Sequence, residues 1–205
     1  RALSGSLAIE AADEAGVLNA LKTLRQVAEP ERGGERLTAY VLPEMTVEDS
    51  PSLAFRGLHL CWFPENDEVS IEKCIRMAAY YKFNYVVLEP WAVFGYASHP
   101  EFAWAEKKIP PKTFKRLARL AREQGVTLIP QLNLFGHASG SRHIAGKHAV
   151  LDFHPEFQPL FEPDGWTWCL SNPATRKLLA DLSLELYEAF DCPPYFHVGC
   201  DEAYS

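Results

Sequence analysis

The sequence predicts an α/β protein: the first half (strands 1–4) of a (β/α)8 TIM barrel, preceded by the remnant of a small α+β domain. From residue 54 onward, short apolar runs alternate with amphipathic helical segments, an order typical of parallel βαβ units. No glycine-rich phosphate-binding motif follows these runs, which disfavours the doubly wound sheet of nucleotide-binding proteins. Residues 54–205 hold four predicted strands, whereas a complete barrel of about 250 residues holds eight.

The first fifty residues differ in character from the rest. We interpret residues 1–50 as the C-terminal part of a small non-catalytic α+β domain, and residues 51–205 as the N-terminal half of a catalytic barrel. The segment Asp49-Ser50-Pro51-Ser52 is typical of a linker between two such units. The elements predicted in the first unit are a helix over residues 14–28, a strand over 37–42 and a strand ending at 8–10.

The elements of the barrel half follow one another as strand and helix in turn. Ser70 is the predicted N-cap of the first helix, and Asn172 is an N-cap followed by proline at the first helical position. Gly125 is the predicted stop of the second helix. The predicted strands cover residues 57–61, 85–88, 127–132 and 195–198, and the predicted helices cover 71–81, 112–124 and 173–190.

The composition excludes several classes of function. The chain has 205 residues, with 20 Lys and Arg against 27 Asp and Glu, and its net charge is −7. An acidic chain without a basic run is a poor partner for nucleic acid or an anionic membrane. No apolar run has the roughly 18 residues of a membrane span. The five cysteines and seven histidines show no metal-binding or disulfide spacing, so we expect no metal and no cofactor.

Candidate functional residues lie where the predicted strands end, because the reacting groups of barrels occupy the carboxyl ends of strands. Aromatic side chains beside carboxylates at these ends indicate a sugar pocket. Asp201-Glu202 is one of four adjacent acidic pairs, but it alone follows an apolar strand. Two acids so close favour one proton donor and one anion. The candidates in chain order are Glu89, Trp91, Asn133, His137, Asp201 and Glu202.

These residues belong to longer blocks that resemble glycoside hydrolase family 20, the β-N-acetylhexosaminidases. Residues 196–202 (Phe-His-Val-Gly-Cys-Asp-Glu) are similar to the H-x-G-G-D-E motif of that family. Further blocks occur in the family's order, and together they span residues 5–205. They are residues 12–26, resembling the end of the small domain; 55–60, resembling the R-G start of strand one; 130–137, resembling the P-G-H block; and 170–173, resembling the N-P helix start.

The resemblance implies hydrolysis of terminal N-acetylhexosamines by substrate-assisted, retaining catalysis. In that mechanism the 2-acetamido oxygen of the substrate attacks the anomeric carbon and forms an oxazolinium intermediate. Glu202 would protonate the leaving oxygen and then activate water, while Asp201 would orient the acetamido group. The resemblance also implies that His137, Glu89, Trp91, Asn133 and Arg56 bind the carbohydrate substrate.

Several positions depart from the common family pattern. That pattern has Asp at position 61 and a sugar-binding Arg at position 64, where this sequence has Cys61 and Pro64. Paired Asp residues after strand two are replaced by Glu89, and a later Asp by Asn133. Cys200 replaces the second Gly of the motif. This set of residues resembles the divergent hexosaminidase D branch, and other groups are expected to hold the sugar in place of the missing Arg.

Two alternatives stay open from the sequence. One is another retaining glycosidase whose nucleophile lies outside residues 1–205, and the other is a catalytically silent carbohydrate-binding relative. The sequence begins with Arg1 and both of its ends look cut, so we expect a fragment that is inactive by itself.

Overall fold

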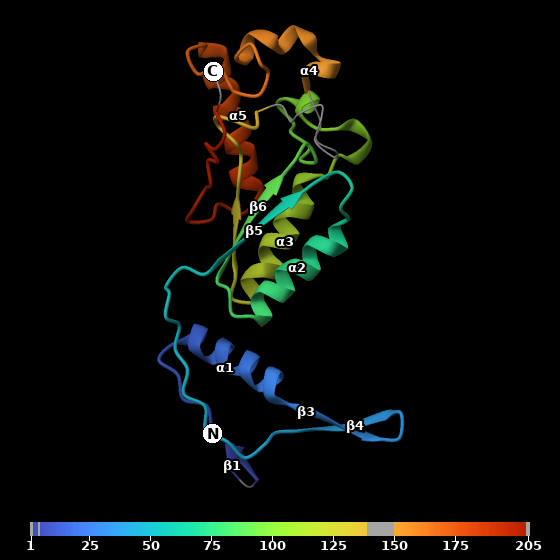
Figure 1. The fold of residues 1–205 in the computed structure, drawn as a ribbon, viewed down its shortest axis with the longest axis vertical. Coiled ribbons are helices and arrows are strands. Elements are labelled where there is room, and N and C mark those ends of the chain that lie inside the picture. Colours follow the sequence, from blue (N-terminus) through green and yellow to red (C-terminus); the bar gives the residue numbers. More distant parts are fainter. Residues whose placement is uncertain (1, 4, 139–149, 204–205) are drawn as a thin grey trace.

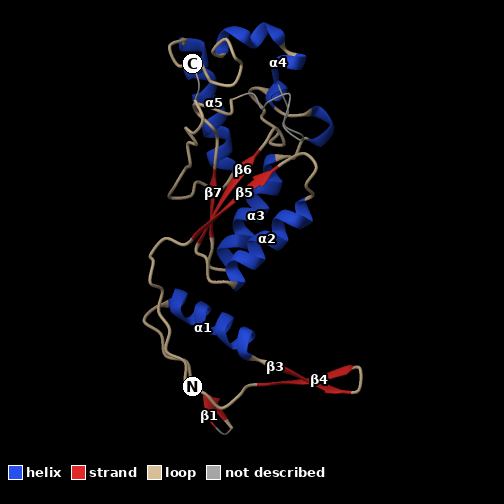
Figure 2. Cartoon of the chain, in the orientation of Figure 1, coloured by secondary structure: helices blue, strands red, loops and turns tan. Residues whose placement is uncertain are grey.

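A three-stranded parallel sheet forms the centre of the computed structural model, which describes residues 2–3, 5–138 and 150–203. Its strands are β5 (Gly57–Trp62), β6 (Tyr85–Pro90) and β7 (Thr127–Pro130), in the order β5-β6-β7. The register pairs Gly57 with Tyr85 and Tyr85 with Thr127, so all three strands start level with one another. Helical crossovers connect the strands, and the predicted α/β class is confirmed (Figure 2).

The helices α2 (Glu68–Tyr80), α3 (Pro111–Glu123) and α5 (Pro173–Ala189) cover one face of this sheet (Figure 1). Asn172 caps α5 as predicted, since its side chain accepts a hydrogen bond from the Ala174 amide. The predicted cap at Ser70 is wrong. Asp67 is the N-cap of α2 and accepts from the Ser70 amide at 2.7 Å, which places Ser70 within the first turn.

The apolar core lies between the helices and the sheet face that they cover, which we call the outer face. Trp62, Leu88 and Phe114 are fully buried there, and the rings of Trp62 and Phe114 lie 5.2 Å apart. Neighbouring residues of a strand point to opposite faces, so the alternate residues belong to the other face, the inner face. His59, Cys61 and Glu89 lie on this inner face, which carries polar groups at its carboxyl end.

The predicted fourth strand over residues 195–198 is wrong for the part of the chain that the structure describes. Only a parallel bridge between Gln131 and His197 forms beside β7, with His197 donating to the Pro130 carbonyl and Leu132 donating to the His197 carbonyl. Two prolines precede this segment and Gly199 follows with a φ of 65°. Pro130 of β7 has no amide to donate to the Tyr195 carbonyl, which the next rung towards the amino end would need, so the pairing does not continue in that direction.

The N-terminal residues form a hairpin, a helix and a second hairpin below the sheet in Figure 1. None of residues 5–50 is buried, so this segment has no core of its own. The predicted strand ending at residues 8–10 is wrong, because pairing stops at residue 7, whereas the predicted helix and second strand are confirmed. That residues 1–50 belong to a domain separate from residues 51–205 stays a prediction. The elements are β1 (Ala2–Leu3), β2 (Ser6–Leu7), α1 (Glu14–Val27), β3 (Glu29–Gly33) and β4 (Arg36–Val41).

Short helices lie in the loops above the carboxyl end of the sheet. They are η1 (Pro100–Phe102), η2 (Ala105–Lys107), α4 (Val150–Phe153) and η3 (Pro155–Leu160). Among the described helices, none combines the length and apolar character of a membrane span.

Candidate active site

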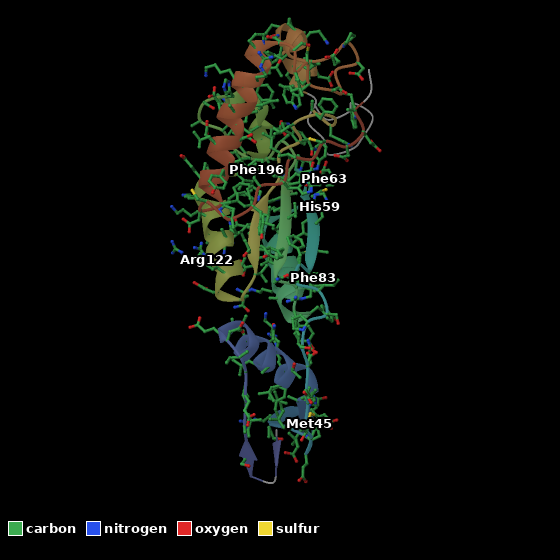
Figure 3. All side chains as sticks on the ribbon, turned by 90° about the vertical axis from the view of Figure 1, so that its left-hand side faces the viewer. Met45, His59, Phe63, Phe83, Arg122 and Phe196 are labelled. Atoms are coloured by element: carbon green, nitrogen blue, oxygen red, sulfur yellow. The ribbon has the colours of Figure 1, made fainter. Side chains whose placement is uncertain are left out.

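The candidate site lies at the carboxyl end of the parallel strands. Cys61 near the end of β5 is in register with Glu89 near the end of β6. Parallel strands end at one edge of a sheet, and barrels carry their functional groups there. In Figure 3, His59 and Phe63 lie towards this edge, and Phe83, which precedes β6, lies at the opposite end. The residues predicted from the ends of the strands therefore lie in one region, the carboxyl end of the sheet.

Glu89 is the buried centre of a polar cluster at this edge, with only 5% of its surface exposed. Its Oε1 accepts a hydrogen bond from the Asn133 carboxamide at 2.6 Å. Its Oε2 lies 3.2 Å from His59 Nε2 and accepts from the Cys61 thiol at 3.4 Å. Gln131 in turn donates to Asn133 Oδ1 at 2.9 Å. Both carboxylate oxygens are thus held by protein groups before any ligand is present.

A small cavity of about 80 Å³ opens beside Glu89. Four predicted site residues line it together, namely Glu89, Trp91, Asn133 and His137. Trp168 also lines it and donates its indole N–H to the Asn133 carbonyl at 2.9 Å. Ligand pockets usually enclose about 300–1,000 Å³, so these residues make up only part of the wall of a sugar-sized pocket.

His137 brings the two acids of the predicted catalytic pair together. Its Nε2 lies 3.3 Å from Asp201 Oδ2 and 3.2 Å from Glu202 Oε2. The imidazole is largely buried, whereas the side chains of both acids are more than half exposed. Gly136 allows this approach, because a Cβ at that position would collide with the main-chain carbonyls of Asp201 and Glu202. The structure therefore joins residues 137, 201 and 202, which the sequence placed at two separate strand ends.

Trp166 is a part of the site that sequence reasoning missed. Its ring lies 4.3 Å from the His137 ring, and its indole N–H donates to the Glu202 carbonyl at 2.7 Å. On the other side, Trp91 meets the His137 ring edge-on at 5.7 Å. Trp166 lies in a loop that follows no predicted strand, so no positional signal in the sequence points to it.

The backbone of the site adopts strained conformations. His137, Cys200 and Glu202 have φ values of 56°, 77° and 46°, in the left-handed region that non-glycine residues rarely occupy. Each such residue costs on the order of 1–3 kcal/mol, and such strain gathers at functional sites. Gly199 also has a positive φ, and a Cβ there would collide with the Asn133 carboxamide. The chain is therefore bent tightly around the residues that carry the acids.

Arg56 does not belong to the site, and its predicted substrate-binding role is wrong. It immediately precedes β5 and lies at the amino end of the sheet, six residues or about 20 Å from the carboxyl end of that strand. Its guanidinium donates to the carbonyls of Lys82 and Leu53, and its amide donates to Asn84 Oδ1. These bonds tie the segment before β5 to the turn before β6, which is a structural role.

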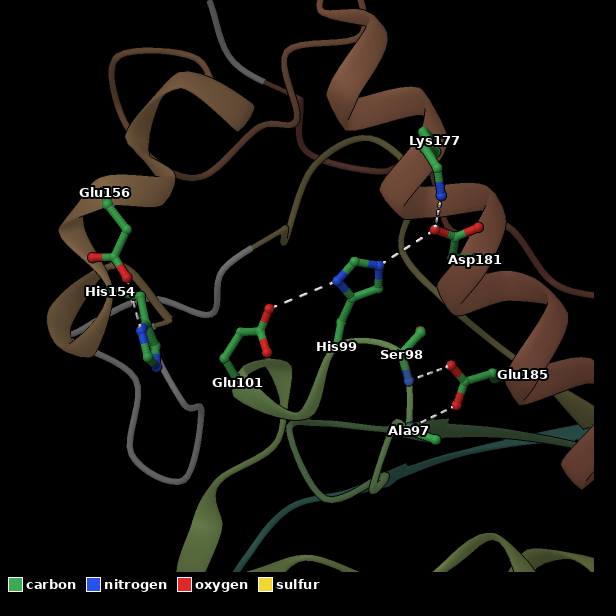
Figure 4. Close-up of polar contacts among 9 residues, drawn as sticks. All are labelled: Ala97, Ser98, His99, Glu101, His154, Glu156, Lys177, Asp181 and Glu185. Atoms are coloured by element: carbon green, nitrogen blue, oxygen red, sulfur yellow. Dashed lines mark hydrogen bonds and ion pairs between the residues drawn. The ribbon is translucent and has the colours of Figure 1, made fainter.

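The loop that carries Trp91 is tied to helix α5 (Figure 4). Glu185 of α5 accepts hydrogen bonds from the amides of Ala97 and Ser98 at 2.7 and 2.8 Å. His99 Nε2 lies 3.3 Å from Asp181, one turn earlier on the same helix. A helix of the outer face thereby holds a wall of the cavity in position.

Comparisons with known proteins agree with this geometry, although no protein-family model matches the chain. A β-N-acetylhexosaminidase of Cellulomonas fimi is 29% identical over 218 aligned positions, which cover 95% of this chain and 41% of that protein. The chain is thus similar in sequence to a β-N-acetylhexosaminidase.

Solved structures of family 20 enzymes share the fold. The β-N-acetylhexosaminidase of Bacteroides fragilis matches with a TM-score of 0.72 at 22% identity, over 95% of this chain and 40% of that one. The family 20 β-N-acetylhexosaminidase of Streptomyces coelicolor matches with a TM-score of 0.67 at 19% identity, over 89% of this chain and 40% of that one. The chain thus spans about two fifths of the length of these relatives.

Proposed function

We propose that the protein containing this chain is an exo-acting, retaining β-N-acetylhexosaminidase that removes terminal GlcNAc or GalNAc by substrate-assisted catalysis. The observation that carries the proposal is the contact of one histidine, His137, with both Asp201 and Glu202 at the end of a parallel sheet. The name of the Cellulomonas fimi relative supports the same substrate class.

The two acids would divide the work between them. Glu202 protonates the glycosidic oxygen as the bond to the anomeric carbon breaks, and the 2-acetamido oxygen of the substrate forms the new bond to that carbon. The Asp201 carboxylate accepts from the acetamido N–H, which stabilises the positive charge that develops there. Water then opens the oxazolinium ring after Glu202 removes its proton, and the configuration at the anomeric carbon is retained.

His137 and Trp166 are positioning residues in this scheme. An imidazole nitrogen within 3.3 Å of both acids limits how far the two carboxylates can separate. The Trp166 indole donates to the Glu202 carbonyl, so this hydrogen bond stabilises the left-handed backbone conformation of Glu202. Trp91 would stack on the sugar ring, and Glu89 and Asn133 would contact its hydroxyls. Their place in the lining of the cavity beside His137 supports these roles.

We further propose that residues 51–205 form the first half of a (β/α)8 barrel. The relatives are about two and a half times as long as the matched region, which leaves room for the remaining strands. The small size of the cavity, about 80 Å³, and the exposed ring of Tyr195 on the inner face fit a sheet that continues beyond this edge. By itself, the chain is therefore expected to be inactive.

Substitution of the two acids tests the division of work. In the active protein, Glu202→Gln should slow the cleavage of substrates with poor leaving groups by about 10²–10⁴-fold, while the first step with an activated phenol survives. Asp201→Asn should slow both kinds of substrate by about 10²–10³-fold, since its stabilisation is needed whatever group leaves. Initial rates and burst kinetics with N-acetylglucosaminides of graded phenols measure both effects.

Two controls make the test specific. Glu156→Gln alters an exposed carboxylate that pairs with His154 away from the acids, and its rates should equal those of the unaltered protein. The plain glucosides should resist cleavage, because they lack the acetamido group. Rapid hydrolysis of glucosides would instead indicate a glycosidase with its own nucleophile, and binding without any turnover would indicate a silent relative.

A further inference from the structure

We infer that His59, Cys61 and Glu89 form a binding site for a zinc-class divalent metal ion on the inner face of the sheet. Their ligand atoms, an imidazole nitrogen, a thiol sulfur and a carboxylate oxygen, all lie within 4.8 Å of one another. Each of these three kinds of donor is a ligand that zinc takes in proteins. The inference concerns ion binding and does not depend on the proposed glycosidase activity.

The distances fit a tetrahedral ion. Ligands bound at about 2.0–2.3 Å around a tetrahedral centre lie roughly 3.3–3.7 Å from one another. Glu89 Oε2 lies 3.2 Å from His59 Nε2 and 3.4 Å from Cys61 Sγ. Two edges of the tetrahedron are therefore close to their final length before an ion binds. The fourth position would be open to water.

The sheet itself holds the three ligands in place. His59 and Cys61 are two residues apart on β5 and so point to the same face, and the register sets Glu89 directly beside Cys61. Asn133 donates to Oε1 of Glu89, which leaves Oε2 directed at the other two ligands, and Gln131 steadies Asn133. Hydrogen bonds of this kind behind a ligating carboxylate are typical of metal sites.

Access and charge also favour an ion. The cluster lies near the carboxyl ends of the strands, which is the open end of a barrel, and within this chain the His59 side chain is 49% exposed although Glu89 is buried. When an ion binds, the thiol proton that now points to Glu89 leaves, and the imidazole carries its remaining proton on Nδ1. A divalent ion with one thiolate and one carboxylate then has no net charge, which suits a partly buried position.

This site explains why a search of the sequence for metal motifs finds nothing. Two ligands come from one strand and the third comes from the next strand, 28 residues after Cys61. The spacing of short metal motifs places ligands within one loop or helix, whereas here the parallel register brings them together.

Titration with cobalt chloride tests the site, on the protein at its natural length after treatment with a chelator. We expect one cobalt ion per chain, a thiolate-to-cobalt charge-transfer band in the near ultraviolet, and displacement of the band by zinc chloride. About one proton should be released per ion, which a weakly buffered titration records. Absence of a stoichiometric charge-transfer band would overturn the inference.

Variants show whether these residues are the ligands. Cys61→Ser should abolish the band, and Cys200→Ser, at an exposed cysteine outside the cluster, should retain it. Asn133→Ala should weaken cobalt binding by about 10–100-fold, because it removes the support behind Glu89. An unchanged band in Cys61→Ser would contradict the assignment. If that variant fails to fold, zinc should still protect Cys61 of the unaltered protein from alkylation, and equal labelling with and without zinc would refute the site.

Discussion

The two faces of the central sheet are made by the same three strands and have opposite characters. On the outer face, Trp62 and Leu88 are fully buried under α2, α3 and α5 in a continuous apolar core. On the inner face, His59, Cys61 and Glu89 contact one another through polar atoms. Because alternate residues point to opposite faces, one strand can supply both stability and chemistry. Substitutions on the two faces are therefore expected to have separable effects.

The largest expected effect is on the stability supplied by the outer face. Leu88→Ala removes a fully buried side chain and should lower the free energy of unfolding by about 2–5 kcal/mol. His59→Ala removes a half-exposed side chain from the inner face and should cost about 1 kcal/mol or less, chiefly one hydrogen bond. Urea unfolding of both variants measures the difference. Equal destabilisation would show that the two faces share one role.

The next largest expected effect is on activity alone, at Gly136 in the loop after β7. Gly136→Ala places a methyl group against the Asp201 and Glu202 carbonyls, so the acids must move. Displacement of reacting groups by about 1 Å costs roughly 10²-fold, and we expect kcat/KM to fall by about that factor. Gly33→Ala, in the hairpin of β3 and β4 where only a Thr38 methyl lies nearby, should leave kcat/KM unchanged. A similar loss in both variants would point to a general defect.

The smallest expected effect is on stability, through the hydrogen bonds by which Glu185 of α5 holds the loop that carries Trp91. Burial acts to raise the pKa of this carboxyl, but hydrogen bonds from Ser98 and Ala97 outweigh it, and the pKa is lowered from the ordinary 4.5. A lowered pKa in the folded protein means that the stabilisation is complete above pH 4.5 and is lost as the pH falls through the folded value. Glu185→Gln should therefore destabilise the protein by about 1 kcal/mol at neutral pH.

Unfolding measured across this acidic range provides the check. The difference in stability between Glu185→Gln and the unaltered protein should shrink as the pH falls. The Glu185 carboxyl then becomes neutral, as the Gln side chain already is. Glu188→Gln, at an exposed position on the same helix, should show no such convergence. A gap that is constant with pH would mean that the ionised carboxylate does not hold the Trp91 loop.

Much of the local structure follows from the sequence. The apolar runs of β5, β6 and β7 are found to within two residues of their predicted bounds, and Asn172 with Pro173 starts α5 as predicted. Such features depend on neighbours in the chain, which periodicity and capping preferences report directly. The strand-end rule also selected Glu89, Trp91, Asn133 and His137, which line one cavity.

Only the tertiary structure determines which residues far apart in the sequence contact one another. Ser70 lies in the first turn of α2 because Asp67 caps that helix and accepts from the Ser70 amide. Arg56 lies at the amino end of β5, where it donates to the Lys82 carbonyl, and not beside the cavity. Trp166 joins the site through contacts with His137, 29 residues earlier, and Glu202, 36 residues later. Such partners depend on strand register and loop paths, and therefore on the packing of the whole chain. The pattern of residues sets which groups face the inner side of the sheet, and only the register determines which of them touch.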